Sequence, residues 1–363
     1  MTQRTQESVE LLKRLIATPS LSKDESKAAE IMAQFLQRDG VRVFRQGNNV
    51  WAVAEHFDEA KPTILLNSHI DTVKPNADWQ RDPFTPVVEG DVLYGLGSND
   101  AGGPLVSYAA VFLHFAEQAA LQCNVVYAAT AEEEISGSGG IVSILDALPH
   151  IDLAFIGEPT EMHMAVAEKG LMVVQCKANG RSGHAARNEG VNAIDIALRD
   201  IAWIHGYSFS KESAVLGPVK MTTTIISAGT QHNVVPATCT FTVDIRSTDV
   251  YTHDEILHIL SRHLQSEIVS VSKRLHPSAI DLMHPVVEAA RRAGMELYGS
   301  PTLSDQSLLS MPRVKIGPGS SQRSHTADEY IKISEIEHGI RTMIQLLSDT
   351  MPHVHKHQPG SSS

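Results

Sequence analysis

Short apolar runs alternate with helical segments through the first half of the chain, and this order restricts the fold more than any other feature. The runs TILLNSHID (63–71), NVVYAAT (124–130) and DLAFIGEP (152–159) have the length of buried strands. Apolar residues with helical spacing lie between them, at about 103–117 and 138–147. Apolar strands that alternate with helices are typical of a mostly parallel sheet covered by helices on both faces. We therefore predict an α/β domain.

The order of elements changes at Gly170. From there the pattern predicts the order β-α-β-β-α-β, which is that of a ferredoxin-like unit. Within it, CTFTVDI alternates apolar and polar residues, as in a sheet that is covered on one face. The expected strands are 171–178, 219–227, 238–246 and 267–275, and the expected helices are 190–205 and 253–265.

The α/β pattern returns after about residue 280, with a helix at 283–298, a strand at 313–317 and a last helix capped by Ser334 and Glu337. At the N-terminus, Ser22 and Glu25 form the pattern of a capping box for a second helix. We therefore expect a discontinuous first domain with a second domain inserted into it. The predicted boundaries are 1–170 with 281–352, 171–280, and a disordered tail at 353–363.

The charge of the chain limits its partners. A formal net charge of -12 comes from 42 acidic and 30 basic residues, which argues against a nucleic-acid partner and against an anionic membrane surface. No apolar stretch reaches the roughly 20 residues of a transmembrane helix, and the first residues lack the apolar core of a signal peptide. We expect a cytoplasmic protein that acts on a small molecule. The cysteines Cys123, Cys176 and Cys239 lie far apart in apolar runs and are expected to be reduced core residues.

Residues that bind metals follow each predicted strand of the first domain. His69 and Asp71 end one strand, three glutamates (132–134) follow the next, and Glu158 follows the third, while Asp100 lies in the loop YGLGSNDAGG. Each of these residues alone is an ordinary turn, cap or surface residue. Together they are expected at one edge, because ligands collect at the carboxyl ends of parallel strands. Histidine with several carboxylates is the ligand set of Zn, Mn or Co, and bridging carboxylates suit a two-metal hydrolase.

The spacing within these motifs suggests how the work is divided. In an extended segment residues i and i+2 point the same way, so Asp71 could hold the second ring nitrogen of His69. Adjacent glutamates in a turn point in different directions, so one could bind a metal while its neighbour acts as a base. The glycines of GLGSNDAGG do not match the dinucleotide fingerprint, because Asp100 stands at the third glycine position.

Seven segments in order resemble the motifs of the M20 metallopeptidase and amidohydrolase family, over roughly residues 60–335. This family includes acetylornithine deacetylase, succinyl-diaminopimelate desuccinylase and glutamate carboxypeptidase. The resemblance implies a zinc-hydrolase catalytic domain with an inserted ferredoxin-like domain that acts as a lid and dimerises. The segments are SHIDTV, YGLGSNDAGG, TAEEEISGSGG, IGEPTEM, GRSGHAARNEGVNAI, QHNVVPATCTFTVDIR and GPGSSQRSHTADEYI.

The resemblance also implies a role for each matching residue in the first domain. Two zinc ions, or Co²⁺ or Mn²⁺ in their place, would be bridged by Asp100, and Glu133 would be the general base. Asp71 would orient His69, and the peptide bond between Asp100 and Ala101 would be cis. The implied ligands are His69 and Glu158 on the first metal and Glu134 and His325 on the second.

The lid is implied to contact the substrate. His184 resembles a histidine that reaches the substrate carbonyl and stabilises the oxyanion, from its own or the partner subunit; a residue that caps the following helix is the alternative. Asn233 and Arg246 resemble substrate-binding residues, and a guanidinium can bind a carboxylate through two hydrogen bonds. Backbone N–H groups of GPGSS, including those of Gly319 and Ser320, could bind the same carboxylate. A homodimer through the lid is also implied.

The expected reaction is metal-assisted hydrolysis of an amide. TLSDQSLL (302–309) and GPGSSQRSHTADEY resemble the acetylornithine-deacetylase side of the family most closely. We therefore expect a deacylase of N-acetyl- or N-succinyl-ornithine or -citrulline in arginine biosynthesis. The alternatives are a succinyl-diaminopimelate desuccinylase, a metallo-dipeptidase or carboxypeptidase, and an inactive homologue that only binds a ligand.

Overall fold

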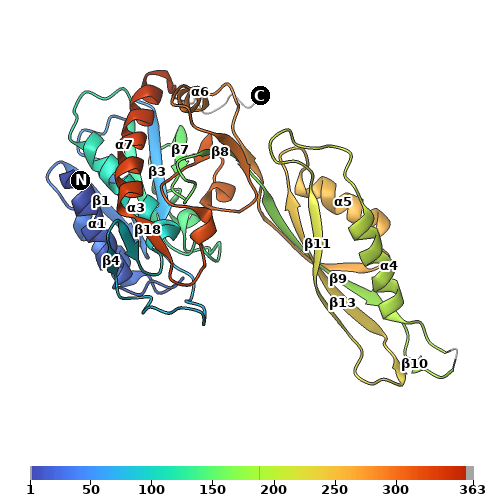
Figure 1. Cartoon of the computed structure of the whole chain (residues 1–363). Helices are drawn as coiled ribbons and strands as arrows, with labels where there is room; N and C mark the ends of the chain where they lie inside the picture. Colours follow the sequence, from blue (N-terminus) through green and yellow to red (C-terminus); the bar gives the residue numbers. More distant parts are fainter. Residues whose placement is uncertain (1, 188, 357–363) are drawn as a thin grey trace. The chain divides into compact units, whose positions relative to one another are not determined.

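The computed structural model describes residues 2–187 and 189–356, which form two compact units (Figure 1). The first unit is formed by Met1–Val166, Ile280–Tyr298 and Ser304–Ser363, and the second by Ala167–Ala279 and Gly299–Leu303. The assignment of 1–170 with 281–352 and of 171–280 as separate domains stays a prediction. Most of the tail expected at 353–363 lies outside the described residues.

The first unit contains most of a nine-stranded sheet whose central strands are parallel. β3 runs parallel to β6 and β7, and β17 runs parallel to β7, while β1, β2 and β8 add antiparallel pairs. This mixed, mostly parallel sheet confirms the predicted fold class. In sheet order the strands are β1 (Val41–Gln46), β2 (Asn49–Ala54), β6 (Asn124–Thr130), β3 (Thr63–His69), β7 (Leu153–Ile156), β17 (Arg313–Lys315), β8 (Met164–Glu168) and β15 (Ser278–Ala279), with β16 (Leu297–Ser300) beside β8.

Both faces of the central sheet are covered, which explains why its strands are apolar throughout. Every residue of β3, β6 and β7 is buried. Helix α3 (Gly103–Ala116) lies against β3 and β6 and is itself packed between α1 (Gln3–Ile16) and α7 (Ile333–Thr350) (Figure 1). Leu65, Val126 and Ala154 of the sheet belong to an apolar cluster that also contains residues outside the sheet. These include Ile141, Ile144, Leu148 and Leu309.

Several predicted helix ends were wrong. Helix α2 (Ser26–Leu36) begins after Glu25, which makes no side-chain cap, so Ser22 and Glu25 do not form a capping box. The helix expected at 138–147 is a short turn, Ile141–Ile144, and α6 spans only Pro285–Arg292. Helix α7 begins at Ile333, and Glu335, instead of Glu337, accepts the N–H of Lys332 at 3.0 Å. Ser22 and Glu25 instead have partners that are distant in the sequence, as described below.

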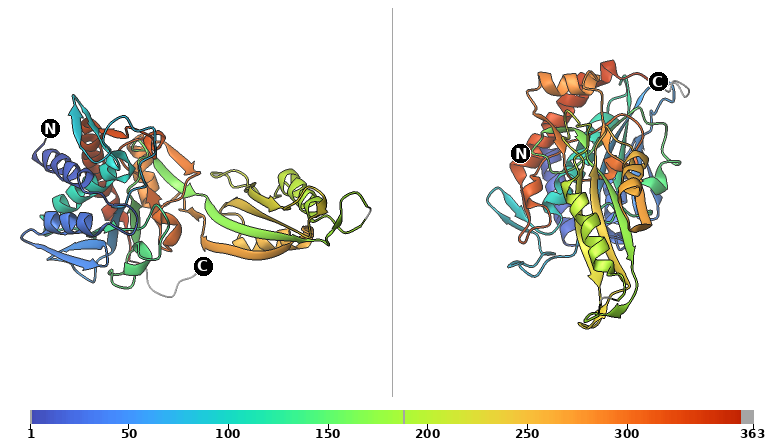
Figure 2. Two further views of the ribbon diagram at one scale, coloured as in Figure 1. Left: turned by 90° about the horizontal axis from the view of Figure 1, so that it is seen from below. Right: turned by 90° about the vertical axis from the view of Figure 1, so that its right-hand side faces the viewer.

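The second unit contains a four-stranded antiparallel sheet in the order β11-β13-β9-β14 (Figure 2) and a separate two-stranded ribbon. Helices α4 (Ala193–Gly206) and α5 (His253–His263) share one apolar core with the alternate residues Cys239, Phe241, Val243 and Ile245. The predicted β-α-β-β-α-β order is therefore confirmed. The strands are β9 (Gly170–Asn179), β11 (Lys220–Ala228), β13 (Thr238–Ser247) and β14 (Glu267–Leu275), and the ribbon is β10 (Gly183–His184) with β12 (Val234–Val235).

A small three-stranded sheet in the first unit supports two loops that matter below. It pairs β4 (Val87–Glu89) with β5 (Val92–Tyr94), and β5 with β18 (Tyr330–Lys332). The segment before β18 therefore lies beside the loop that follows β5. The three cysteines are buried and free, as predicted. Among the described residues, none of the helices is long and apolar enough to cross a membrane.

Candidate metal centre

The ends of three parallel strands bring four of the predicted site residues of the first unit together. His69 is the last residue of β3 and lies in register with Thr130, the last residue of β6. Glu133 and Glu134 follow β6 in a tight turn, and Glu158 follows β7. Because these strands are parallel, their carboxyl ends lie at one edge of the sheet. The side chains therefore converge although the strands are distant in the sequence.

His69 lies at the buried end of this group. Its Nδ1 is 2.9 Å from the backbone oxygen of Asp71 and 3.5 Å from the Asp71 carboxylate. Its Nε2 points the other way and lies 3.2 Å from Asp100 Oδ1. The same nitrogen is 3.9 Å from Glu133 Oε2 and 3.9 Å from Glu158 Oε1. The main chain and side chain of Asp71 thus face one nitrogen of the ring, and the second nitrogen faces three carboxylates.

Asp100 lies between the two histidines of the site. Its Oδ1 is 3.2 Å from His69 Nε2, and its Oδ2 is 3.7 Å from His325 Nε2. The peptide bond from Asp100 to Ala101 is cis, as predicted. A carboxylate whose two oxygens face different histidines has the orientation that a bridging ligand requires.

The turn at 132–134 gives its three glutamates different surroundings. The two oxygens of the Asp71 carboxylate accept the N–H groups of Glu133, at 3.0 Å, and Glu134, at 3.2 Å. Glu134 lies 3.0 Å from His325 Nε2. Glu132 has a positive φ of 55°, and its carboxylate accepts the N–H of Gly139 at 3.1 Å. Glu132 therefore stabilises the turn through this hydrogen bond.

Two residues before α2, which were predicted to form a helix cap, contact the same turn instead. The hydroxyl of Ser22 donates to Asp71 Oδ2 at 2.7 Å. Glu25 is fully buried and accepts the N–H groups of Lys23, at 2.6 Å, and Glu132, at 3.3 Å. The Ser22 and Glu25 pattern was visible in the sequence, but its partners were not.

Two further residues near Asp100 were also missed. The side chain of Asn99 donates to the backbone oxygen of Ser320 at 3.0 Å and accepts the N–H of Ser320 at 2.9 Å. The carboxylate of Glu329 accepts three backbone N–H groups of the loop that contains Asp100. Glu329 lies in the quoted motif RSHTADEY, four residues after His325, and its place before a strand was the only signal for it.

The charges of the cluster explain how it could hold cations. Burial raises the pKa of Glu133 well above its usual range, and the neighbouring charges of Glu158, Asp305 and Glu134 add to this although His69 opposes it. Burial raises the pKa of Glu158 to about 8. These shifts arise because negative charge is crowded into a site shielded from water. A divalent cation would relieve that crowding.

The donor atoms fit a metal site by their type and spacing. His69 forms one group with Asp100 and Glu134 and another with Glu133 and Glu158, and in each group the ligand atoms lie within 4.8 Å of one another. Imidazole and carboxylate donors suit zinc, manganese or cobalt. The chain therefore has a candidate site for metal ions at the edge of the sheet.

The predicted lid residues belong to the second unit. His184 and Asn233 are exposed neighbours on the β10/β12 ribbon, where the N–H of Ala185 donates to the Asn233 backbone oxygen at 3.0 Å. Arg246, near the end of β13, donates to both oxygens of Asp244 at 2.9 and 3.1 Å. One edge of the Arg246 guanidinium is thus engaged within the unit. The roles of these residues toward a substrate stay predictions.

The glycine-rich loop after β17 uses part of its hydrogen-bonding capacity internally. Besides its N–H bond to Asn99, Ser320 donates its hydroxyl to Glu161 Oε1 at 2.6 Å. The N–H of Gly317 donates to Thr160 Oγ1 at 3.0 Å. Gly319 has a φ of 92°, a conformation that favours glycine. The Ser320 N–H therefore already has a partner within the unit, and the contact of Gly319 and Ser320 with a substrate carboxylate stays a prediction.

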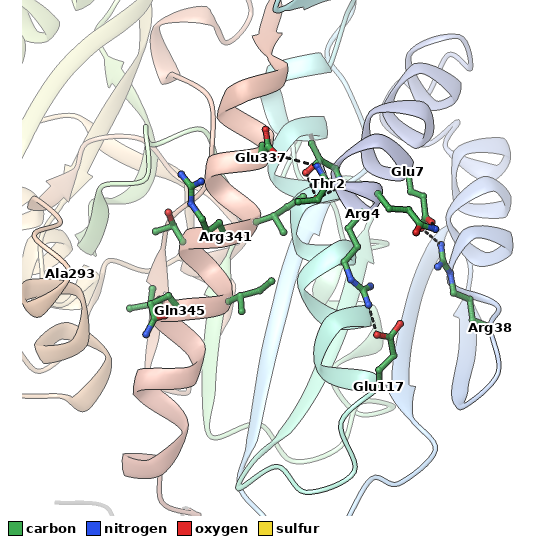
Figure 3. Close-up of a pocket in the computed structure, with 15 residues that line it drawn as sticks. Thr2, Arg4, Glu7, Arg38, Glu117, Ala293, Glu337, Arg341 and Gln345 are labelled. Carbon is green, nitrogen blue, oxygen red and sulfur yellow. Dashed lines mark hydrogen bonds and ion pairs between the residues drawn. The ribbon is translucent and has the colours of Figure 1, made fainter.

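A wide groove in the first unit lies away from this cluster. Figure 3 shows it between α1 and α7, with the ion pair of Arg4 and Glu117 across one side. The predicted ligands do not line this groove. His69, Asp71 and Asp100 instead line a separate, small cavity. The size of a groove alone would therefore not have located the predicted ligands.

Comparison with known proteins agrees with this geometry. The profile of peptidase family M20/M25/M40 matches residues 65–349. Succinyl-diaminopimelate desuccinylase 2 of Ruegeria sp. (strain TM1040) is 26% identical over 92% of each chain. Acetylornithine deacetylase of Edwardsiella ictaluri is 27% identical, over 89% of this chain and 92% of its own.

A solved structure has the same fold at low sequence identity. A dinuclear metal-binding peptidase of the M20 family from Bacillus subtilis has a TM-score of 0.74 at 15% identity and covers 97% of this chain and 99% of its own. The family resemblance inferred from the motifs is therefore confirmed. The chain belongs to peptidase family M20/M25/M40 and is a metallohydrolase with a candidate metal site of histidine and carboxylate ligands.

Proposed function

We propose that this metallohydrolase cleaves the amide bond of an N-acyl-L-amino acid and uses two zinc ions as its cofactor. The orientation of Asp100 is the observation that supports this most strongly. Its two oxygens face His69 and His325, at 3.2 and 3.7 Å, as a carboxylate shared between two ions would. In this proposal the first ion has His69 and Glu158 as its other ligands, and the second has Glu134 and His325.

Two ions held there would activate a water molecule and polarise the carbonyl group of the amide. Glu133 would take the proton of that water and pass it to the departing amine. Its place suits this task, because its N–H is fixed by Asp71 at 3.0 Å and its carboxylate lies 3.9 Å from His69 Nε2. Burial, which raises the pKa of Glu133, favours a carboxyl group that can hold a proton.

The second unit would act as the lid. His184 would donate a hydrogen bond to the oxyanion that forms from the amide carbonyl, and Asn233 would bind the substrate beside it. Arg246 would bind the substrate carboxylate with the guanidinium edge that does not face Asp244, together with the N–H of Gly319. Closure over the substrate would exclude water from the reaction.

N-acetyl- or N-succinyl-ornithine or -citrulline is the proposed substrate, in arginine biosynthesis. Similarity to acetylornithine deacetylase over nearly the whole chain supports this choice. A succinyl-diaminopimelate desuccinylase is the second candidate, because a relative of that name is similarly close.

A homodimer through the lid is part of the proposal. β11 is the edge strand of the four-stranded sheet, and its Ile225 and Ile226 side chains are 61% and 52% exposed. An unpaired edge with apolar side chains favours pairing with a second copy. Sedimentation of the purified protein as a monomer at micromolar concentration would exclude this arrangement.

The substrate is tested with a panel of N-acetyl- and N-succinyl-ornithine, -citrulline and -diaminopimelate, using zinc-loaded protein with and without a chelator. The expected result is chelator-sensitive hydrolysis, with the highest kcat/KM on an acyl-ornithine or acyl-citrulline. A maximum on N-succinyl-diaminopimelate would instead identify a desuccinylase. If no compound, including a set of dipeptides, were hydrolysed in a chelator-sensitive way, the chain would be an inactive homologue that only binds its ligand.

A further inference from the structure

A buried carboxylate that is not among the proposed ligands connects the two loops of the metal centre. Glu329 is 2% exposed. Its Oε1 accepts the N–H groups of Asn99 and Asp100, each at 2.8 Å, and its Oε2 accepts the N–H of Gly97 at 2.9 Å. Its backbone oxygen accepts the N–H of Gly95 at 3.0 Å. Both the main chain and the side chain of Glu329 are therefore bonded to the loop of Asp100.

The same residue lies in the loop of His325. His325 and Asp328 have positive φ values of 60° and 53°, so the chain turns sharply between them. The next residue, Tyr330, begins β18 and pairs with Tyr94 in β5. Glu329 is thus the point at which the loop that presents His325 is bonded to the loop that presents Asp100.

The chemistry of the contact requires an acceptor with two oxygens. Three backbone N–H groups converge on one buried position, and a buried N–H without a partner is costly. A carboxylate can accept all three, and no other side chain offers two acceptor atoms without a donor. Gly97 has a φ of 71°, which favours glycine, and a Cβ there would lie 2.5 Å from the Thr72 side chain, so the loop also passes close to Thr72.

We propose that Glu329 is a positioning residue of the metal centre, which sets the separation of Asp100 and His325 by bonding their loops together. This inference rests on the proposed function, in which those two residues share the second ion. Glu329 itself is not placed as a ligand, because both of its oxygens are used by N–H groups. Removing its second acceptor oxygen would let the two loops move apart and would weaken that ion first.

A matched control separates this role from simple stabilisation of the fold. Asp200, in α4 of the second unit, is 3% exposed and accepts the N–H groups of Gln265 at 3.0 Å and Ser266 at 2.8 Å. It is a buried carboxylate that bonds a loop by the same chemistry, and none of the proposed ligands belongs to that loop. Asp200→Asn should therefore lower stability without changing the metal centre.

The test compares the full-length wild type, Glu329→Gln and Asp200→Asn by the dissociation constant of each Zn²⁺ equivalent, the visible spectrum of the Co²⁺ form, and Tm. We expect Glu329→Gln to raise the dissociation constant of the weaker equivalent about 10- to 100-fold, the usual cost of losing an outer partner of a metal site. Its Co²⁺ spectrum should change. Asp200→Asn should lower Tm and keep the wild-type constants and spectrum.

Wild-type constants and an unchanged Co²⁺ spectrum in Glu329→Gln would overturn the inference. If Glu329→Gln does not fold, Glu329→Asp is measured in the same way. Its side chain keeps both carboxylate oxygens but is one methylene shorter, so the oxygens lie farther from the loop of Asp100. Weaker binding of one equivalent in Glu329→Asp would support the inference, and unchanged binding would overturn it. A wild type that binds fewer than two equivalents would instead refute the proposed two-metal function, which is a separate outcome.

Discussion

The two histidines of the candidate metal centre are held in different ways. The His69 side chain is 1% exposed and ends a strand that is buried throughout, whereas the His325 side chain is 54% exposed and lies on a loop. The Nε2 of His69 faces the proposed ligand Asp100 at 3.2 Å, and its Nδ1 has a further partner in the main chain and side chain of Asp71, at 2.9 and 3.5 Å. The nearest partner of His325 is the proposed ligand Glu134, at 3.0 Å.

This difference implies unequal binding of two ions. A ligand fixed by a buried strand and a second partner loses little freedom when it binds a metal, and such preorganisation favours tight binding. A ligand on an exposed loop has more freedom to lose, because loops open more easily than core strands. We therefore expect the ion beside His69 to be bound more tightly than the ion beside His325.

The largest expected effect separates the base from the ligand within the glutamate turn. Glu133→Ala should keep its metal and lower kcat by about 100- to 10,000-fold, the range that a general base contributes. Glu134→Ala should lose the ion beside His325, because Glu134 is a proposed ligand of that ion. Elemental analysis and steady-state kinetics of both variants measure this.

Wild-type turnover by Glu133→Ala would refute its assignment as the base. Two metal equivalents retained by Glu134→Ala, with metal lost from Glu133→Ala, would reverse the two roles. The distances alone do not separate a base from a ligand here, because a carboxylate oxygen of Glu133 and one of Glu158 each lie 3.9 Å from His69 Nε2.

A smaller effect is expected when the affinities of the ion beside His69 and the ion beside His325 are compared directly. Titration of the zinc-loaded protein with a chelator should remove the ions in two steps, separated by about tenfold in free zinc concentration, which corresponds to about 1.4 kcal/mol. His325→Ala should abolish the first step and leave the second. A single step that removes both equivalents together, in the wild type, would show that the comparison is wrong.

The smallest effect is expected for Ser22, which contacts Asp71, the partner of the buried His69. Ser22→Ala removes the hydroxyl that donates to Asp71 at 2.7 Å. A hydrogen bond of this kind contributes about 1 kcal/mol, so kcat/KM should fall about fivefold. The control is Ser261→Ala, which removes an exposed hydroxyl that donates to a backbone oxygen in α5. Equal kcat/KM values for the two variants would mean that Asp71 does not depend on Ser22.

Much of the fold and of the site could be predicted because their signals are local. Continuous apolar strands indicated the parallel sheet, and strict alternation in CTFTVDI indicated a sheet covered on one face. Parallel strands place their carboxyl ends together, so the convergence of His69, Glu133 and Glu158 followed from their positions after three strands. Asp100 was expected at the same edge from its loop, and the family motifs added its bridging role and supplied His325, for which position in the pattern gave no argument.

Residues that act through distant partners could not be predicted in this way. Ser22 and Glu25 match a capping box in the sequence, yet their partners Asp71 and Glu132 lie 49 and 107 positions away. Glu329 bonds to Asp100 across 229 positions. No local pattern distinguishes these carboxylates and hydroxyls from ordinary caps and surface residues.

The sequence by itself determined three things: the apolar strands and helices of the first unit, the inserted second unit, and the set of residues from which a metal site could be made. Only the tertiary structure decided which polar groups hold that site: Asp71 for the glutamate turn, and Glu329 for the loop of Asp100. The physical reason is that apolar periodicity follows from the geometry of one helix or strand. A buried polar group must instead find whatever donor the folded chain brings within hydrogen-bonding distance.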